Sequence, residues 1–131
     1  MVISHELWEE MVAHARESFP NEACGLVAAQ NGQAVKVYRL TSAEPSPVFY
    51  RIDPKEQLQA MMEMDDRDWE LGIIFHSHTR TRAYPSATDI DLAHYPDALY
   101  AIVSLAQDPP DVRAYTIVDG KVEEATLEVV D

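Results

Sequence analysis

Residues 71–75, with the sequence LGIIF, constrain the fold of this chain more than any other segment. A strand that is apolar at every position is buried on both faces, which is typical of a central strand covered on either side. The run therefore predicts a layered domain of the α/β or α+β class. A chain of 131 residues is long enough to form one such domain with its own core. We expect residues 1–131 to form a single domain.

Helices and further strands are predicted before and after this run. Apolar residues at helical spacing follow a capping Ser4 and predict a helix over 5–18, which Pro20 ends. Asp53 and Pro54 begin a second helix that reaches about residue 66, and Ser86 begins a third. Strands are predicted at 24–29, 35–40, 49–52, 71–75, 99–105, 112–118 and 122–130. These elements make a mixed sheet of six or seven strands with three helices, whose topology the sequence leaves open.

The charge balance excludes several classes of function. Lys and Arg number 10 against 23 Asp and Glu, for a net charge of −13, and no cluster of cations exists. Binding to phosphate backbones or to anionic membrane surfaces needs such clusters, so we expect neither nucleic acid nor membrane as a partner. The acidity serves either solubility or selection of a basic partner. The N-terminus has no signal-peptide pattern, and no apolar run could span a bilayer, so we expect a cytoplasmic enzyme.

The polar residues that follow the apolar run form the most informative pattern. His76 and His78 are two positions apart, so on a strand both imidazoles project to the same face. Ser86 follows after seven residues and can cap a helix, which places Asp89 in the first turn of that helix. We therefore expect two imidazoles and one carboxylate to meet at the carboxyl end of a buried strand.

Two imidazoles and one carboxylate are suitable zinc ligands, and three protein ligands leave a fourth position for water. This is the catalytic arrangement, because structural zinc sites are closed by four protein ligands. An iron oxygenase also uses two histidines and one carboxylate. Its usual spacing is His-x-Asp or His-x-Glu with a distant histidine, unlike the pattern here. An amidohydrolase also begins with His-x-His, but its barrel needs about 250 residues.

The pattern of His76, His78, Ser86 and Asp89 resembles the signature of the JAMM (MPN-plus, or JAB-domain) zinc metallopeptidases, and every position of that pattern is matched. That signature also includes an upstream glutamate, and residues 21–26 (NEACGL) resemble the segment that supplies it. The resemblance extends from the first helix to about Val118. It implies a mixed sheet wrapped by about three helices, related to the cytidine-deaminase fold. The sequence departs from the family pattern at Thr79, where many members have proline.

The resemblance implies a role for each residue of the pattern. His76, His78 and Asp89 would bind one Zn²⁺ per chain, Glu22 would be the general acid and base, and Ser86 would help to hold the oxyanion. General chemistry agrees, since a carboxylate outside the ligand set can take a proton from the catalytic water and return it to the leaving amine.

The residues around the pattern are similar to those of bacterial family members that act on ubiquitin-like sulfur-carrier proteins. Residues 49–54 (FYRIDP) and 83–86 (AYPS) carry this likeness. It implies hydrolysis after the carrier's C-terminal glycine, with cysteine as the first candidate for the released residue. The chain lacks the long insertions of the eukaryotic deubiquitinases, so cleavage of polyubiquitin is not expected. General maturation of carrier C-termini and a non-catalytic scaffold are the alternatives, and a homodimer is left open.

Several other residues are of types that can act in catalysis or binding, and for most of them we expect a structural role instead. We expect His5, His14 and His94 to be surface histidines. Cys24 opens an apolar strand and is interpreted as a small buried residue. Because it is the one cysteine, no internal disulfide can form. Arg80 and Arg82 flank the pattern and either hold a carboxylate or are solvated loop charges. Trp8 and Trp69 are expected to pack in the core or against helices.

Overall fold

The computed structural model of the chain describes residues 1–131 and contains eight strands and three helices. The strands are β1 (Val2–Ser4), β2 (Cys24–Gln30), β3 (Gln33–Leu40), β4 (Glu70–His78), β5 (Leu99–Ser104), β6 (Asp111–Val118), β7 (Lys121–Ala125) and β8 (Glu128–Val130). The helices are α1 (His5–Ser18), α2 (Pro54–Asp66) and α3 (Ala87–Asp91). All strands belong to one sheet in the order β7-β6-β5-β4-β2-β3-β1-β8. The predicted mixed sheet with three helices is confirmed.

Strand β4 contains the apolar run and lies in the interior of the sheet. It pairs antiparallel with β2, where Cys24 lies opposite His76, and parallel with β5. The parallel pairing requires a crossover, which residues 79–98 provide together with α3. Strands β2 and β3 form the predicted hairpin, and Asn31 and Gly32 both adopt positive φ in its turn.

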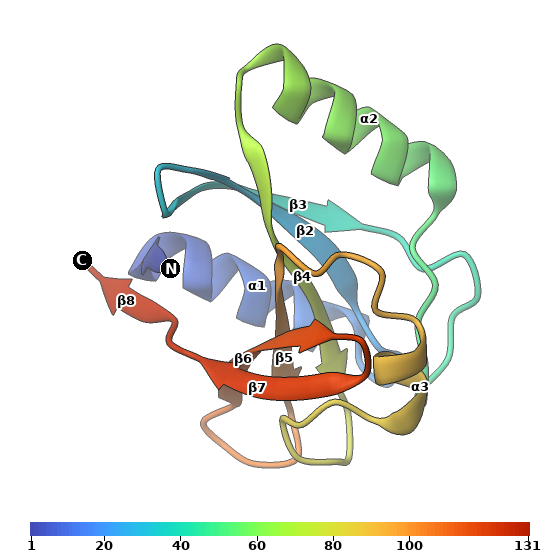
Figure 1. Cartoon of the computed structure of the whole chain (residues 1–131). Coiled ribbons are helices and arrows are strands. Elements are labelled where there is room, and N and C mark those ends of the chain that lie inside the picture. Colours follow the sequence, from blue (N-terminus) through green and yellow to red (C-terminus); the bar gives the residue numbers. More distant parts are fainter.

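Helices α1 and α2 cover opposite faces of the sheet (Figure 1). Met11, Val12 and Ala15 of α1 pack in one core with Phe75 and other buried residues of the sheet. Ala60 and Met64 of α2 pack in a second core that includes Ile74. Neighbouring residues of β4 thus serve different cores, which is why its sequence is apolar without interruption. No helix has the combination of length and apolar character that a membrane span requires.

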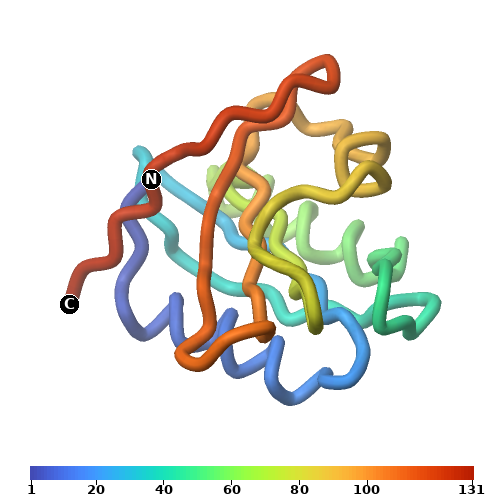
Figure 2. The backbone as a smooth tube through the Cα atoms, turned by 90° about the horizontal axis from the view of Figure 1, so that it is seen from below, coloured from blue at the N-terminus to red at the C-terminus, as the bar shows by residue number.

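The sheet curls around α1. The two edge strands, β7 and β8, are separated in the sequence by residues 126 and 127 alone. The two edges must therefore approach each other, and α1 contacts β1, β3 and β8 as well as the central β4 and β5. Figure 2 shows the chain passing from β7 back to the N-terminal segment. The N-terminal ammonium donates to the Thr126 carbonyl at 3.2 Å, which ties the two ends of the chain together.

Four details differ from the expectations. The segment 49–52 is not a strand, and only an isolated bridge joins Ile52 to Ser42. The predicted strand at 122–130 is divided into β7 and β8, which lie at opposite edges. Strand β1 was not predicted, because its three residues are too few to show an alternating pattern. With it, the sheet has eight strands. Finally, β4 is longer than the predicted 71–75, since it extends from Glu70 to His78.

Candidate metal centre

Three side chains meet on the α2 face of the sheet, at the carboxyl end of β4. The Nε2 atoms of His76 and His78 lie 3.1 Å apart, and each is 3.1 Å from Oδ2 of Asp89. Both histidines are buried and Asp89 is half-buried. The structure thus brings the three predicted ligands together, and they form its one group of three or more His, Cys, Asp or Glu residues suited to a metal ion.

Local structure explains why the three side chains converge. His76 and His78 alternate with Ser77 on an extended strand, so both imidazoles point to one face. Ser86 caps α3 through a complete capping box: its Oγ accepts from the Asp89 backbone N–H at 3.1 Å, and its own N–H donates to Asp89 Oδ2 at 2.9 Å. The box turns the Asp89 carboxylate back toward β4. The predicted cap is therefore also the element that aims the third ligand.

The geometry of the three atoms fits zinc. A tetrahedral ion with bonds of 2.0–2.1 Å has ligand atoms about 3.3 Å apart along each edge. The three observed separations of 3.1 Å are close to this value. Two imidazole nitrogens and a carboxylate oxygen at such distances repel each other unless protons or a cation lie between them. The group has three such side chains and no fourth, which is the number of protein ligands typical of a catalytic zinc site.

The two histidines are held by different means. His78 uses Nδ1 to donate to the Arg82 carbonyl at 2.9 Å, so its Nε2 presents a lone pair to the centre. The Nδ1 of His76 is buried without a partner. The ring of His76 is instead stacked on Tyr50, with the ring centroids 4.5 Å apart. Tyr50 was missed in the sequence, because nothing in residues 49–52 indicates that this loop returns to the end of β4.

The pKa values follow from burial and from the contact with Asp89. Burial lowers the pKa of His76. Burial also disfavours the charged form of His78, but the hydrogen bonds to Asp89 and to the Arg82 carbonyl raise its pKa overall. Although burial opposes it, the hydrogen bonds from the two histidines hold the pKa of Asp89 well below its usual range. The Asp89 carboxylate is therefore ionised, as a metal ligand must be.

Glu22 lies beside this group, two residues before the start of the neighbouring strand β2. The β2–β4 register, continued by the Ser77 N–H bond to the Ala23 carbonyl at 3.1 Å, places Glu22 opposite His78. Only 6% of Glu22 is exposed, and its Oε1 has no hydrogen-bond partner. Burial raises its pKa to about 7, with a smaller contribution from the Asp89 charge and an opposing one from His78. A carboxyl group with this pKa can both accept and release a proton near neutral pH.

The remaining candidates lie outside the centre. The thiol of Cys24 is buried, as predicted, and burial raises its pKa to about 12. Arg80 is exposed, and Arg82 lies over the Tyr84 ring at 4.8 Å. His5 is exposed, as predicted. The expectation for His14 is wrong, because its half-buried ring lies 3.0 Å from the carbonyls of both Cys24 and Leu40. It joins α1 to the ends of β2 and β3.

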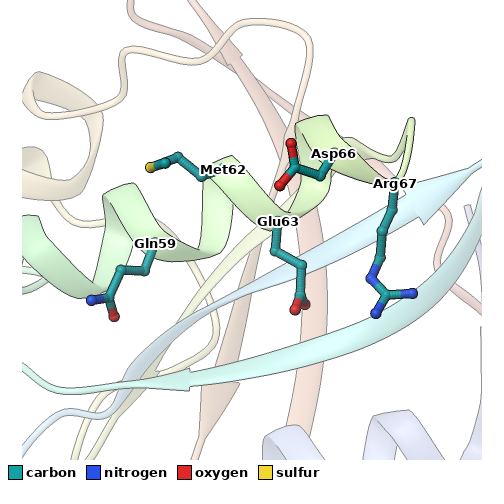
Figure 3. A pocket seen from close by; sticks show the side chains of 5 residues that line it. All are labelled: Gln59, Met62, Glu63, Asp66 and Arg67. Carbon is teal, nitrogen blue, oxygen red and sulfur yellow. The ribbon is translucent and has the colours of Figure 1, made fainter.

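An open hollow of about 470 Å³ lies on α2, away from these residues (Figure 3). Its five lining residues all come from the second half of α2 and its C-cap: Gln59, Met62, Glu63, Asp66 and Arg67. Gln59, Glu63 and Arg67 extend to one side of the helix, and Met62 and Asp66 extend to the other (Figure 3). Glu63 accepts a hydrogen bond from Tyr38 of β3 at 2.6 Å. This bond joins α2 to β3, and none of the candidate site residues lines the hollow.

Several known proteins are similar to this chain in sequence and in fold. The sequence pattern of the prokaryotic homologues of the JAB domain matches residues 4–118. The chain belongs to this family. A relative from Mycobacterium tuberculosis, named CysO-cysteine peptidase, is 47% identical over 135 residues, which cover 100% of this chain and 92% of the relative. A desampylase from Haloferax volcanii is 31% identical over 104 residues, which cover 73% of this chain and 74% of the relative.

A solved structure of a protein from Desulfitobacterium hafniense has the same fold over nearly the whole chain. It has a TM-score of 0.88 and 38% sequence identity, covering 98% of this chain and 92% of that protein. The JAB domain predicted from the His76, His78, Ser86 and Asp89 pattern is therefore confirmed as the family and fold of this chain.

Proposed function

We propose that this chain is a cytoplasmic, single-domain zinc peptidase that hydrolyses the bond after the C-terminal glycine of a ubiquitin-like sulfur-carrier protein. His76, His78 and Asp89 bind the zinc. Glu22 is the general acid and base, and Ser86 donates to the oxyanion. The observation that carries the proposal is the triangle of ligand atoms, 3.1 Å on each side, beside a buried carboxyl group.

The chain's own residues supply the proton transfers and the positioning. Zinc, when bound, polarises the scissile carbonyl and lowers the pKa of a water molecule. Glu22 takes the proton of the attacking water and returns it to the leaving amine. Its orphaned Oε1 and its pKa of about 7 suit this double role. The Oγ of Ser86 already accepts from the Asp89 N–H, so its hydroxyl proton is free to donate to the developing oxyanion.

The substrate class is inferred from the relatives. Two of them are named CysO-cysteine peptidase and desampylase. A flexible C-terminal glycine suits a metal centre at the end of a strand, because glycine lets the peptide backbone approach closely. Cysteine is our first candidate for the released residue, given the 47% identity to the CysO-cysteine peptidase. A maturation peptidase that removes any extension is the second.

One experiment tests the substrate and the metal together. The protein, purified without added metal, is first analysed for bound elements, and we expect one zinc per chain. It is then incubated with a carrier–cysteine adduct and with carriers extended by other residues, each followed by intact mass. Release of cysteine alone supports the first candidate, and equal release of any extension supports the second. No release from any carrier with zinc bound would refute the proposal, as would iron in place of zinc.

A further inference from the structure

A cavity of about 400 Å³ lies beside the candidate metal centre, and its role deepens the proposed function, on which it rests. The cavity is bounded by the loop that carries Phe49 and Tyr50 and by the segment after α3 that carries Leu92 and Tyr95. Eight of its 11 lining residues are hydrophobic. A concave site that is largely apolar with a few polar groups is typical of a ligand site.

The floor of the cavity is a row of the sheet next to the metal ligands. Leu26, Ile74 and Tyr100 lie side by side in register on β2, β4 and β5. The next row along β4 contains His76. Rows on one face of a strand are two residues apart, or about 6.6 Å. Tyr50 connects the two rows, since it lines the cavity and is stacked on the His76 ring.

The position of Glu22 indicates which part of the substrate lies over the cavity. The register places Glu22 opposite His78, one row beyond His76 on the side away from the cavity floor. Because Glu22 protonates the leaving amine, the released residue lies on that side. The acyl part of the substrate, which is the tail of the carrier, therefore extends over the cavity.

The charge of the cavity agrees with an apolar or uncharged occupant. The chain contains 23 Asp and Glu residues, yet none of them lines the cavity. The charged or titratable groups at its wall, apart from the tyrosines, are Arg51 and His94. A basic side chain would find no carboxylate here, whereas an apolar side chain would be surrounded by aliphatic and aromatic groups.

We propose that this cavity binds an apolar side chain of the carrier tail. This side chain belongs to the third or fourth residue from the end, if the glycine of the scissile bond is counted as the first. An extended peptide advances about 3.3 Å per residue, so these residues lie about 7–10 Å from the reacting carbonyl. The cavity floor begins about 6.6 Å from the His76 row, so residues at this distance from the carbonyl lie over the floor. Since side chains alternate along an extended peptide, one of the two positions faces the cavity.

The test uses synthetic peptides of the form acetyl-Ala-Xaa-Yaa-Gly-Gly-Cys. Leucine, alanine or glutamate is placed at Xaa or Yaa, and the release of cysteine by the zinc-loaded protein gives kcat/KM. Binding of the matching peptides without the cysteine is measured by NMR titration of the zinc-loaded Glu22→Gln variant, which gives Kd without turnover. We expect leucine at one of the two positions to raise kcat/KM and to lower Kd by about tenfold or more relative to alanine.

Variants at the mouth of the cavity identify the site. Leu92→Ala and Phe49→Ala should each reduce the preference for leucine to less than about threefold. Leu58→Ala is the matched control, because Leu58 is 60% exposed and Leu92 is 58% exposed, but Leu58 does not line the cavity. Leu92→Arg should exchange the preference, so that the peptide with glutamate at the sensitive position binds better than the one with leucine.

The outcomes separate the cavity from the proposed function. Tighter binding of the leucine peptide without any cysteine release would support the cavity and contradict the peptidase. Cysteine release and binding that are equal for leucine, alanine and glutamate would contradict the cavity and leave the peptidase standing. A preference for leucine that survives both Leu92→Ala and Phe49→Ala would also overturn the cavity proposal.

Discussion

At the scale of single residues, the candidate centre contains two kinds of acidic side chain. Asp89 faces two imidazoles, and their hydrogen bonds keep its pKa well below the usual range even though it is partly buried. Glu22 has no such partner, and burial raises its pKa to about 7. Two carboxyl groups in one site thus differ in proton affinity because their neighbours differ. This difference suits one of them to bind a metal and the other to transfer protons.

Substitutions should separate these two roles. His76→Ala and Asp89→Ala should lose bound zinc and peptidase activity together, because each removes one of three ligands. Glu22→Gln should retain zinc and lose activity by a hundredfold or more, because the amide cannot transfer the proton. Elemental analysis and cysteine release from the carrier adduct measure the two effects. His5→Ala is the control, and substantial activity in Glu22→Gln would mean that another residue is the base.

The raised pKa of Glu22 also predicts how the stability of the zinc-free protein depends on pH. The folded state binds the Glu22 proton more tightly than the unfolded chain, whose glutamates titrate near 4.5. Folding stability from this group is therefore present below about pH 4.5 and is lost as the pH rises through about 7. Relative to that of the wild type, the free energy of unfolding of Glu22→Gln should increase by about 1–3 kcal/mol as the pH rises from 5 to 8.

Urea unfolding of both proteins in the presence of a chelator measures this difference. Glu70→Gln is the matched control, since Glu70 is exposed on β4 and has no salt bridge in the structure. A constant difference between wild type and Glu22→Gln across this pH range would show that Glu22 is not desolvated in the folded protein.

At the scale of elements, the short helix α3 has little to stabilise it except its cap. It has five residues and buries none of them, yet it carries the third ligand. Helices of this length do not form by propensity alone. The capping box between Ser86 and Asp89 therefore fixes both the helix and the direction of the carboxylate.

Removing this cap should weaken metal binding as well as catalysis. Ser86→Ala loses the bond to the Asp89 N–H, which stabilises such caps by about 1 kcal/mol, and it also loses the proposed donor to the oxyanion. We expect weaker zinc affinity in a competition assay with a chromophoric chelator and a decrease in kcat on the order of a hundredfold. Ser86→Thr, which keeps a hydroxyl, should restore most of both. Unchanged kcat in Ser86→Ala would exclude a role in holding the oxyanion.

The pairing of β2 with β4 depends on a glycine. Gly25 lies opposite Phe75, and a Cβ on Gly25 would collide with the Phe75 ring and with the Tyr38 carbonyl. Gly25→Ala should therefore destabilise the protein by about 1–3 kcal/mol, as overpacking does in other cores. Urea unfolding measures the change. The effect should be smaller in a Phe75→Leu background, where the ring is absent, and an equal effect in both backgrounds would contradict this explanation.

At the scale of the whole molecule, the candidate centre joins the interior of the sheet to the crossover that follows β4. The ligands on β4 belong to the interior of the sheet, whereas Asp89 belongs to the crossover between β4 and β5. An ion bound to all three would tie this crossover to the sheet. Binding to the folded state alone would also raise the free energy of unfolding.

Metal removal should therefore lower the thermal stability of the protein. At a free zinc concentration 1,000 times the Kd, zinc binding adds about 4 kcal/mol to the free energy of unfolding. For a domain of this size, that corresponds to a fall in Tm of about 10–20 °C when a chelator is added. Differential scanning calorimetry with and without the chelator measures it. The Tm of Asp89→Ala should not respond to the chelator, and a response equal to that of the wild type would place the ion elsewhere.

The sequence by itself determined most of the local structure and the composition of the centre. Helices 5–18 and 54–66, the hairpin at Asn31-Gly32 and the buried strand could be predicted, because caps, turn residues and periodicity act within a few residues. The convergence of His76, His78 and Asp89 could be predicted because they lie within 14 consecutive residues around one strand end and one helix cap.

Only the tertiary structure decided what depends on contacts between distant segments. The division of residues 122–130 into β7 and β8 follows from the curl of the sheet, which brings its two edges together. The stacking of Tyr50 on His76, the burial that raises the pKa of Glu22 and the bonding of His14 each join residues from different elements. Such contacts depend on how the sheet curls and which loops return to it, and no local pattern in the sequence carries that information.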